Sequence, residues 1–187
     1  MGLTGPPAQD GATCSTEPIE EKPMRIVPLS LLGLALASAQ ALAATPQPVN
    51  QQNVSLQLAN ALLDSTMAAC HADGRTAAVA VVDRGGNLVA LQRDDNVGPH
   101  NTIAAQRKAY TALSSKTPTR LFGERARNNP DAANLNTFDE LLLLGGGVPL
   151  RVGDEVIGAI GVAGAGGAET DEACATQAIA QLLPSKS

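Results

Sequence analysis

The chain has 187 residues, of which 44% are hydrophobic and only 2% aromatic, and its formal net charge is −5. That length suits one domain with extensions, and a core of Ala, Val, Leu and Gly packs by close backbone approach instead of by large rings. Because the charge is negative and no basic patch is present, the sequence gives no electrostatic support for nucleic-acid binding.

The N-terminal part contains a segment typical of a secretory signal peptide. Arg25 precedes an apolar run over residues 26–36, and small residues follow it as far as Ala41 and Ala43. This pattern predicts cleavage near Ala44, and the apolar run is too short for a membrane span. We therefore expect a bacterial protein that is periplasmic or secreted, with no stable membrane span after processing.

The apolar run does not begin at the first residue, although signal peptides start at the N-terminus. Met24 is therefore the expected true start, and a long leader that is still processed is the alternative. We expect a non-native or mis-assigned extension over residues 1–23, a signal peptide over 24–43, a lead-in over 44–54 and one domain over 55–187.

The first half of this domain predicts a helix, a hairpin and two further helices. Asp73-Gly74 suits a helix end because glycine adopts the left-handed conformation easily, and residues 83–87 suit a turn between two apolar segments. The expected elements are a helix over 55–72, strands over 77–82 and 88–93, helices over 102–115 and 119–127, and a loop to residue 140.

The second half predicts strands and a final helix. Gly153-Asp154 suits a tight hairpin between the last two strands. Gly158 and Gly161 normally weaken a strand, so we expect another part of the chain to pack very close to that backbone. Hairpin connections favour a mostly antiparallel sheet with helices packed against it, an α+β arrangement. The expected strands cover residues 141–144, 148–152 and 155–164, and the glycine turn 145–147 separates the first two.

Two cysteines remain in the mature part of the chain. Cys70 closes the first helix, and Cys174 lies in the first turns of the last one. If the two helices pack antiparallel in an oxidising compartment, the thiols meet and form a disulfide. The alternative is that both cysteines are independent small residues of the core.

Two histidines are present, and they differ in context. His71 lies at a helix end, where an exposed imidazole that helps to cap carbonyl groups is the expected role. His100 precedes a helix that carries Arg107 and Lys108, and such a combination could ligate a haem iron and neutralise the propionates. The alternative is that His100 only flanks a helix start that Asn101 or Thr102 caps.

Other patterns of reactive residues give little indication of function. There is no zinc-ligand spacing, no c-type haem attachment motif and no Gly-x-Ser-x-Gly elbow. The adjacent carboxylates Asp94-Asp95 and Asp171-Glu172 are expected to be solvated. The glycine loop 164–167 fails as a dinucleotide fingerprint because Glu169 stands where its last glycine belongs. These residues and motifs alone therefore do not indicate a particular reaction.

Several motifs, in order along residues 55–183, resemble one family of proteins. The sequence is similar to the GlcG/HbpS-like family of haem-binding proteins, to which the C-terminal domain of PduO-type proteins is related. The motifs that carry the resemblance are residues 80–88, Gly98-Pro99-His100, residues 107–112, residues 144–150 and residues 158–162.

The resemblance implies a profilin-like fold, a five-stranded antiparallel sheet with packed helices, and a homo-oligomer. It also implies non-covalent binding of haem or another porphyrin, linked in some members to iron or haem handling. The Gly98–His100 loop and Lys108 match family motifs, while His100 as the iron ligand is inferred from its chemistry. The candidate cofactor-binding residues are His100, Arg107, Lys108 and Tyr110.

We favour a non-enzymatic haem-binding protein and assign no catalytic residue. A second hypothesis is a small-molecule binder or enzyme that uses a pocket at the glycine-rich strands, with Arg107 and Lys108 holding an organic acid. A third is an accessory subunit whose glycine-rich strands let protomers pack.

Overall fold

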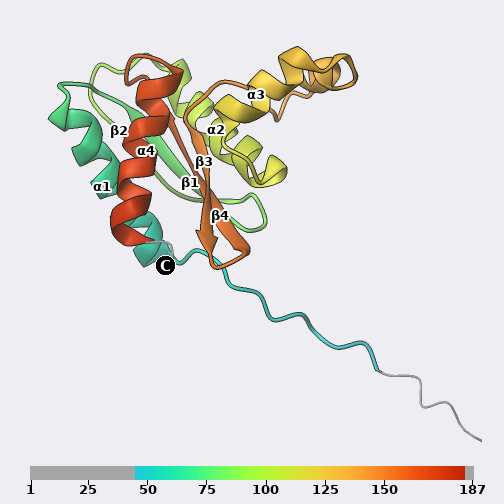
Figure 1. Ribbon diagram of the computed structural model, residues 1–187. Coiled ribbons are helices and arrows are strands. Elements are labelled where there is room, and N and C mark those ends of the chain that lie inside the picture. The colour runs from blue at the N-terminus through green and yellow to red at the C-terminus, as the bar shows by residue number, and fades with distance from the viewer. Residues whose placement is uncertain (1–44, 184–187) are drawn as a thin grey trace, which may run out of the picture. The chain divides into compact units, whose positions relative to one another are not determined.

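The computed structural model describes residues 45–183 (Figure 1). The extension and the signal peptide expected from the sequence lie outside the described residues. The elements are α1 (Leu56–Ala72), β1 (Ala78–Asp83), β2 (Leu88–Arg93), α2 (His100–Ser115), α3 (Thr119–Asn128), the 3-10 helix η1 (Pro130–Thr137), β3 (Gly147–Val152), β4 (Glu155–Ala163) and α4 (Ala168–Leu182). In this part of the chain, every helix is too short or too polar to cross a membrane.

Local sequence signals explain how the first elements begin and end. The Ser55 hydroxyl accepts a hydrogen bond from the Leu58 N–H group and caps α1. Between β1 and β2, the Asp83 carboxylate accepts hydrogen bonds from the N–H groups of Gly85 and Asn87, both at 2.8 Å. Burial by itself raises the pKa of Asp83, but hydrogen bonds from Asn87 and the turn backbone outweigh burial and bring the pKa below its ordinary value of 3.8.

The sheet contains four strands among the described residues, in the order β2-β1-β4-β3. All neighbouring strands are antiparallel, and the register pairs Ala78 with Ala163 and Gly147 with Gly161. The antiparallel α+β arrangement was therefore predicted correctly, and the count of five strands was wrong.

The segment expected to be the fifth strand, residues 141–144, is a loop. Two of its backbone groups are bound by side chains of α2 instead of by a neighbouring strand. The Leu141 carbonyl accepts a hydrogen bond from Arg107 Nη2 at 2.7 Å, and the Leu142 N–H group donates to Thr111 Oγ1 at 2.8 Å. Four consecutive leucines look like a strand in sequence, but several backbone groups of this segment already have partners outside the sheet.

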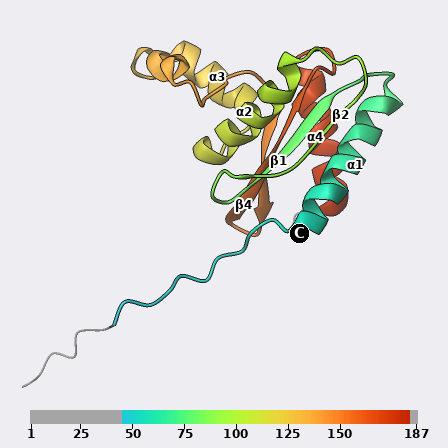
Figure 2. The same cartoon turned by 180° about the vertical axis from the view of Figure 1, so that it is seen from behind.

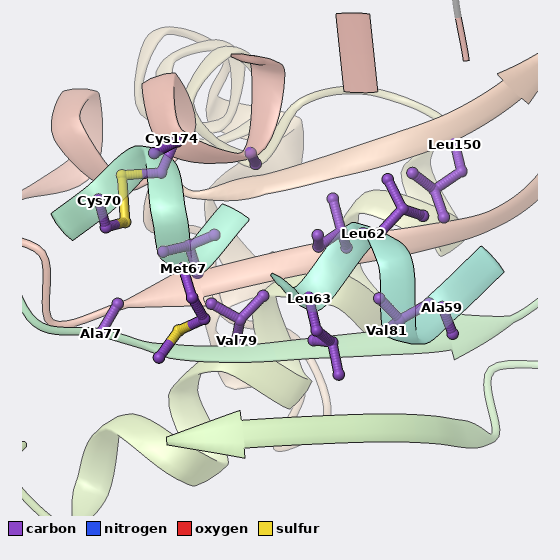
Figure 3. Packing of buried hydrophobic residues seen from close by; sticks show 14 of the residues in the cluster. Ala59, Leu62, Leu63, Met67, Cys70, Ala77, Val79, Val81, Leu150 and Cys174 are labelled. Carbon is purple, nitrogen blue, oxygen red and sulfur yellow. A yellow bond between two sulfur atoms is a disulfide. The ribbon is translucent and has the colours of Figure 1, made fainter. Parts of the chain in front are cut away.

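Helices cover the two faces of the sheet unequally. Helices α1 and α4 lie together on one face, and α2 lies across the other (Figures 1 and 2). Helix α3 and the following η1 project beyond the sheet in both views. The largest core cluster lies under α1 and α4, and Figure 3 shows Leu62, Leu63 and Met67 of α1 beside Val79 and Val81 of β1.

A disulfide joins the two helices of this face. Cys70 of α1 and Cys174 of α4 are bonded, with 5.3 Å between their Cα atoms (Figure 3). The two residues are 104 positions apart. In the chain-entropy model, a cross-link that closes a loop of about 100 residues stabilises the folded state by about 4.7 kcal/mol.

On the opposite face, α2 packs directly on strand backbone. A Cβ atom at Gly161 would overlap the Ala105 carbonyl of α2, and a Cβ atom at Gly147 would overlap the Lys108 carbonyl. The prediction that another segment lies very close to the backbone at Gly161 is thus confirmed, and the segment is α2. These glycines let the helix axis approach the sheet more closely than any side chain would allow.

Candidate functional site

A pocket of about 390 Å³ lies where the first half of α2 meets two glycine loops. One loop, with Leu144 and Gly145, precedes β3, and the other, residues 164–167, connects β4 to α4. His100 and Lys108 both line this pocket. Close backbone packing of α2 on β3 and β4 therefore brings two of the predicted residues beside the glycine loops.

His100 is the first residue of α2 and lies in the wall of the pocket. It is exposed, and within residues 45–183 its imidazole takes part in no hydrogen bond or ion pair. The ring packs close to Gly98, where a Cβ atom would lie 3.0 Å from the His100 Cε1 atom. Both ring nitrogens are therefore available to an external group.

The expectation that Asn101 or Thr102 caps the start of this helix was wrong. Helix α2 begins one residue after Pro99, which makes no side-chain capping bond. The Asn101 side chain instead donates to the Gly98 carbonyl at 3.2 Å, and the Asn101 N–H group donates to the same oxygen at 2.9 Å. These bonds close the turn that presents His100.

Lys108 lies deeper in the same pocket, and its ammonium group is bound by other residues of the chain. Its Nζ atom donates to Asp171 Oδ2 at 2.7 Å and to the Val162 carbonyl at 2.9 Å. The Lys108 and Asp171 side chains are 6% and 5% exposed. The other Asp171 oxygen accepts the Ala165 N–H group at 2.8 Å, so the ion pair also fixes the loop between β4 and α4.

The expectation that Asp171-Glu172 is a solvated pair was wrong for Asp171, which is buried. No local pattern marks its partner, because Lys108 lies 63 positions earlier in the chain. The contact between His71 and Asp94 was also not predicted from the sequence. Its Nε2 atom lies 2.9 and 3.0 Å from the two Asp94 oxygens, and Asp94 also accepts the Ala77 N–H group. His71 therefore binds a carboxylate instead of helix carbonyls.

Arg107 and Tyr110 do not join His100. Arg107 donates to the Leu141 carbonyl, and its Nε atom is buried without a hydrogen-bond partner among the described residues. Tyr110 lines a different pocket, beside Gly86. Helical geometry explains the separation of Tyr110 from His100, since ten residues of an α-helix span about 15 Å. Arg107 is not among the residues that line the pocket at His100, and the Lys108 ammonium group is bound by Asp171 and the Val162 carbonyl. These two residues therefore give the organic-acid hypothesis no support.

The pocket at His100 combines an imidazole with apolar residues. An imidazole without an internal partner could hold a haem iron, and Ala104, Leu144 and Gly145 form a small apolar wall beside it. Within residues 45–183, no group of three or more His, Cys, Asp or Glu side chains is arranged to hold a bare metal ion. A haem iron does not need such a group, because the porphyrin supplies four nitrogen ligands.

Comparisons with known proteins agree on one family. The family model described as haem degrading protein HbpS-like matches residues 54–180. Protein GlcG of Escherichia coli K12 is 34% identical over 109 residues, which cover 58% of this chain and 80% of GlcG.

Two solved structures extend the comparison to the fold. A double mutant of HbpS from Streptomyces reticuli is 34% identical, with a TM-score of 0.69 over 78% of this chain and 98% of that chain. The complex of PduOC with haem shares the fold at 24% identity, with a TM-score of 0.63 over 70% of this chain and 96% of that chain.

Proposed function

Because this chain belongs to the HbpS-like family of the GlcG/HbpS-like proteins, we propose that it binds haem without covalent attachment, in the pocket at the start of α2. The observation that carries the proposal is His100, an exposed imidazole with no partner among residues 45–183, in the wall of a pocket of about 390 Å³. The description of the family as haem degrading supports the choice of ligand.

His100 would hold the haem iron, and the glycine loops line the pocket beside it. Bound haem would supply a redox-active iron for haem or iron handling. Lys108 has a positioning role in this proposal, because its ammonium group is held by Asp171 and the Val162 carbonyl. The pair keeps the loop between β4 and α4 in the shape that leaves the pocket open. We assign no catalytic residue.

An absorption titration of the purified protein with haemin tests this proposal. We expect a saturable shift of the Soret band that His100→Ala abolishes. His71→Ala is the matched control, since it removes the other histidine, whose imidazole is already bound to Asp94. A shift that survives in His100→Ala would move the iron ligand to another residue. No shift in the wild-type protein would refute haem binding.

We also propose that the protein is exported to the bacterial periplasm or secreted. The disulfide between Cys70 and Cys174 supports this, because such bonds persist in oxidising compartments. Mass spectrometry of the protein from a periplasmic fraction should give an N-terminus near Ala44. A protein found intact in the cytoplasm would contradict export.

A homo-oligomer with a profilin-like subunit is part of the same proposal. Leu144 lines the haem pocket and is 57% exposed, and Ile103, one helical turn after His100, is 64% exposed. A second copy of the chain would bury these side chains. It would also cover the part of a bound haem that a single subunit leaves exposed to solvent. Light scattering should therefore give a mass above 19.0 kDa, and a mass at or below that of one chain would contradict the assembly.

A further inference from the structure

A second pocket, of about 430 Å³, lies at the other end of α2. The end of the helix meets the turn between β1 and β2 and the hairpin between β3 and β4 there. We propose that this pocket binds a small dianion, a phosphate or a dicarboxylate, independently of haem. None of its lining residues belongs to the pocket at His100.

The pocket gathers cations from three separate segments. Arg84 comes from the first turn, Lys116 from the end of α2, and Arg151 from β3. Two carboxylates, Asp154 and Glu155, also line the pocket, so its formal charge is 3 − 2 = +1. The chain has a net charge of −5, and a net positive pocket on such a protein favours an anionic ligand.

Internal bonds hold both guanidinium groups in place. Arg84 Nη1 donates to Glu155 Oε2 at 3.1 Å and to the Val156 carbonyl at 3.2 Å. Arg151 Nη2 donates to the Lys116 carbonyl at 2.8 Å. Each guanidinium keeps further N–H groups for a ligand, and a cation that is already positioned loses little entropy on binding.

Lys116 supplies the third cation from a backbone position that usually holds glycine. It follows α2 in the left-handed conformation, with φ +50°. A lysine there is strained relative to glycine, and residues in this conformation cluster at functional sites. Among residues 45–183 the Lys116 ammonium group has no hydrogen-bond or ion-pair partner, so its charge is available in the pocket.

Tyr110 adds a neutral donor to the same wall. Its ring lies against Gly86, where a Cβ atom would be 2.8 Å from the Tyr110 Cε2 atom. Within the described part of the chain, its hydroxyl group has no hydrogen-bond partner. Guanidinium, ammonium and hydroxyl groups together match the oxygens of a phosphate or carboxylate, and the volume suits a small molecule.

Titration calorimetry with inorganic phosphate and with succinate, at constant ionic strength, tests the proposal. Lys116→Gly is the decisive variant, because glycine suits the left-handed backbone and the variant should fold at least as well as the wild type. We expect it to weaken binding about tenfold or more, since a hydrogen bond from a charged group is lost. Lys116→Arg should retain binding.

Arg93→Gln is the control for net charge, because Arg93 lies on β2 outside this pocket. Binding of neither phosphate nor succinate would overturn the proposal. An equal effect of Lys116→Gly and Arg93→Gln would also overturn it, since only the overall charge would matter. If acetate bound as tightly as succinate, selection of a dianion would be refuted. The haemin titration of Lys116→Gly should match that of the wild type, which separates the two sites.

Discussion

Lys108 Nζ lies 2.7 Å from Asp171 Oδ2, and this ion pair joins α2 to the first turn of α4 although the two helices cover opposite faces of the sheet. The pair is almost completely buried. A buried pair is not in itself a large source of stability, because both ions lose their hydration. Lys108 also binds the Val162 carbonyl, and Asp171 also binds the Ala165 N–H group. The ion pair therefore fixes the end of β4 and the glycine loop that follows this strand.

Removal of one partner of this pair should lower the free energy of unfolding more than removal of both. Asp171→Ala leaves a buried ammonium group without its counter-ion, and we expect the free energy of unfolding to fall by about 3–5 kcal/mol. The double variant Lys108→Met/Asp171→Leu removes both charges and should be less destabilised. Urea unfolding of both variants measures the difference. A double variant less stable than Asp171→Ala would contradict this account.

A methyl group at Gly161 should disturb the contact between α2 and the sheet. Gly161→Ala places a Cβ atom against the Ala105 carbonyl, and we expect a loss of about 1–3 kcal/mol or more on thermal unfolding. Gly153→Asn is the control, because an added Cβ atom there meets nothing within 4 Å and asparagine tolerates its φ of +58°. An unchanged stability of Gly161→Ala would refute the close packing.

Asp83 should make stability depend on pH. Its pKa is lowered in the folded protein, so its contribution is present above the unfolded value and is lost as pH falls through the folded value. The difference in unfolding free energy between wild type and Asp83→Asn should therefore shrink as pH falls from about 6 to about 3, through the ordinary aspartate range. A difference that stays constant over this range would show that the carboxylate charge is not responsible.

Much of the fold could be predicted from local sequence patterns. The first helix was expected over 55–72 and runs over Leu56–Ala72, and the hairpin strands agree within one residue. Helix α2 begins two residues earlier than expected, at His100, because the turn at Gly98 is closed by Asn101. Periodicity and turn residues decide such elements, and both are local properties.

The errors have long-range causes. Residues 141–144 are apolar enough for a strand, but Arg107 and Thr111 occupy their backbone groups from another element. The pairing of Lys108 with Asp171 depends in the same way on α2 and α4 meeting at the end of β4. Of the four candidate binding residues, only His100 and Lys108 share a pocket, since the helix carries Tyr110 to its other end.

The bond between Cys70 and Cys174 also determines how the protein responds to proteolysis. All four strands lie between these two residues in the chain, so a single peptide-bond cleavage in β1, β2 or any later loop before α4 leaves two fragments still covalently joined. The nicked molecule would migrate as one species until it is reduced. Both edges of the sheet thus stay attached to one another after a cut that would divide a reduced chain into separate pieces.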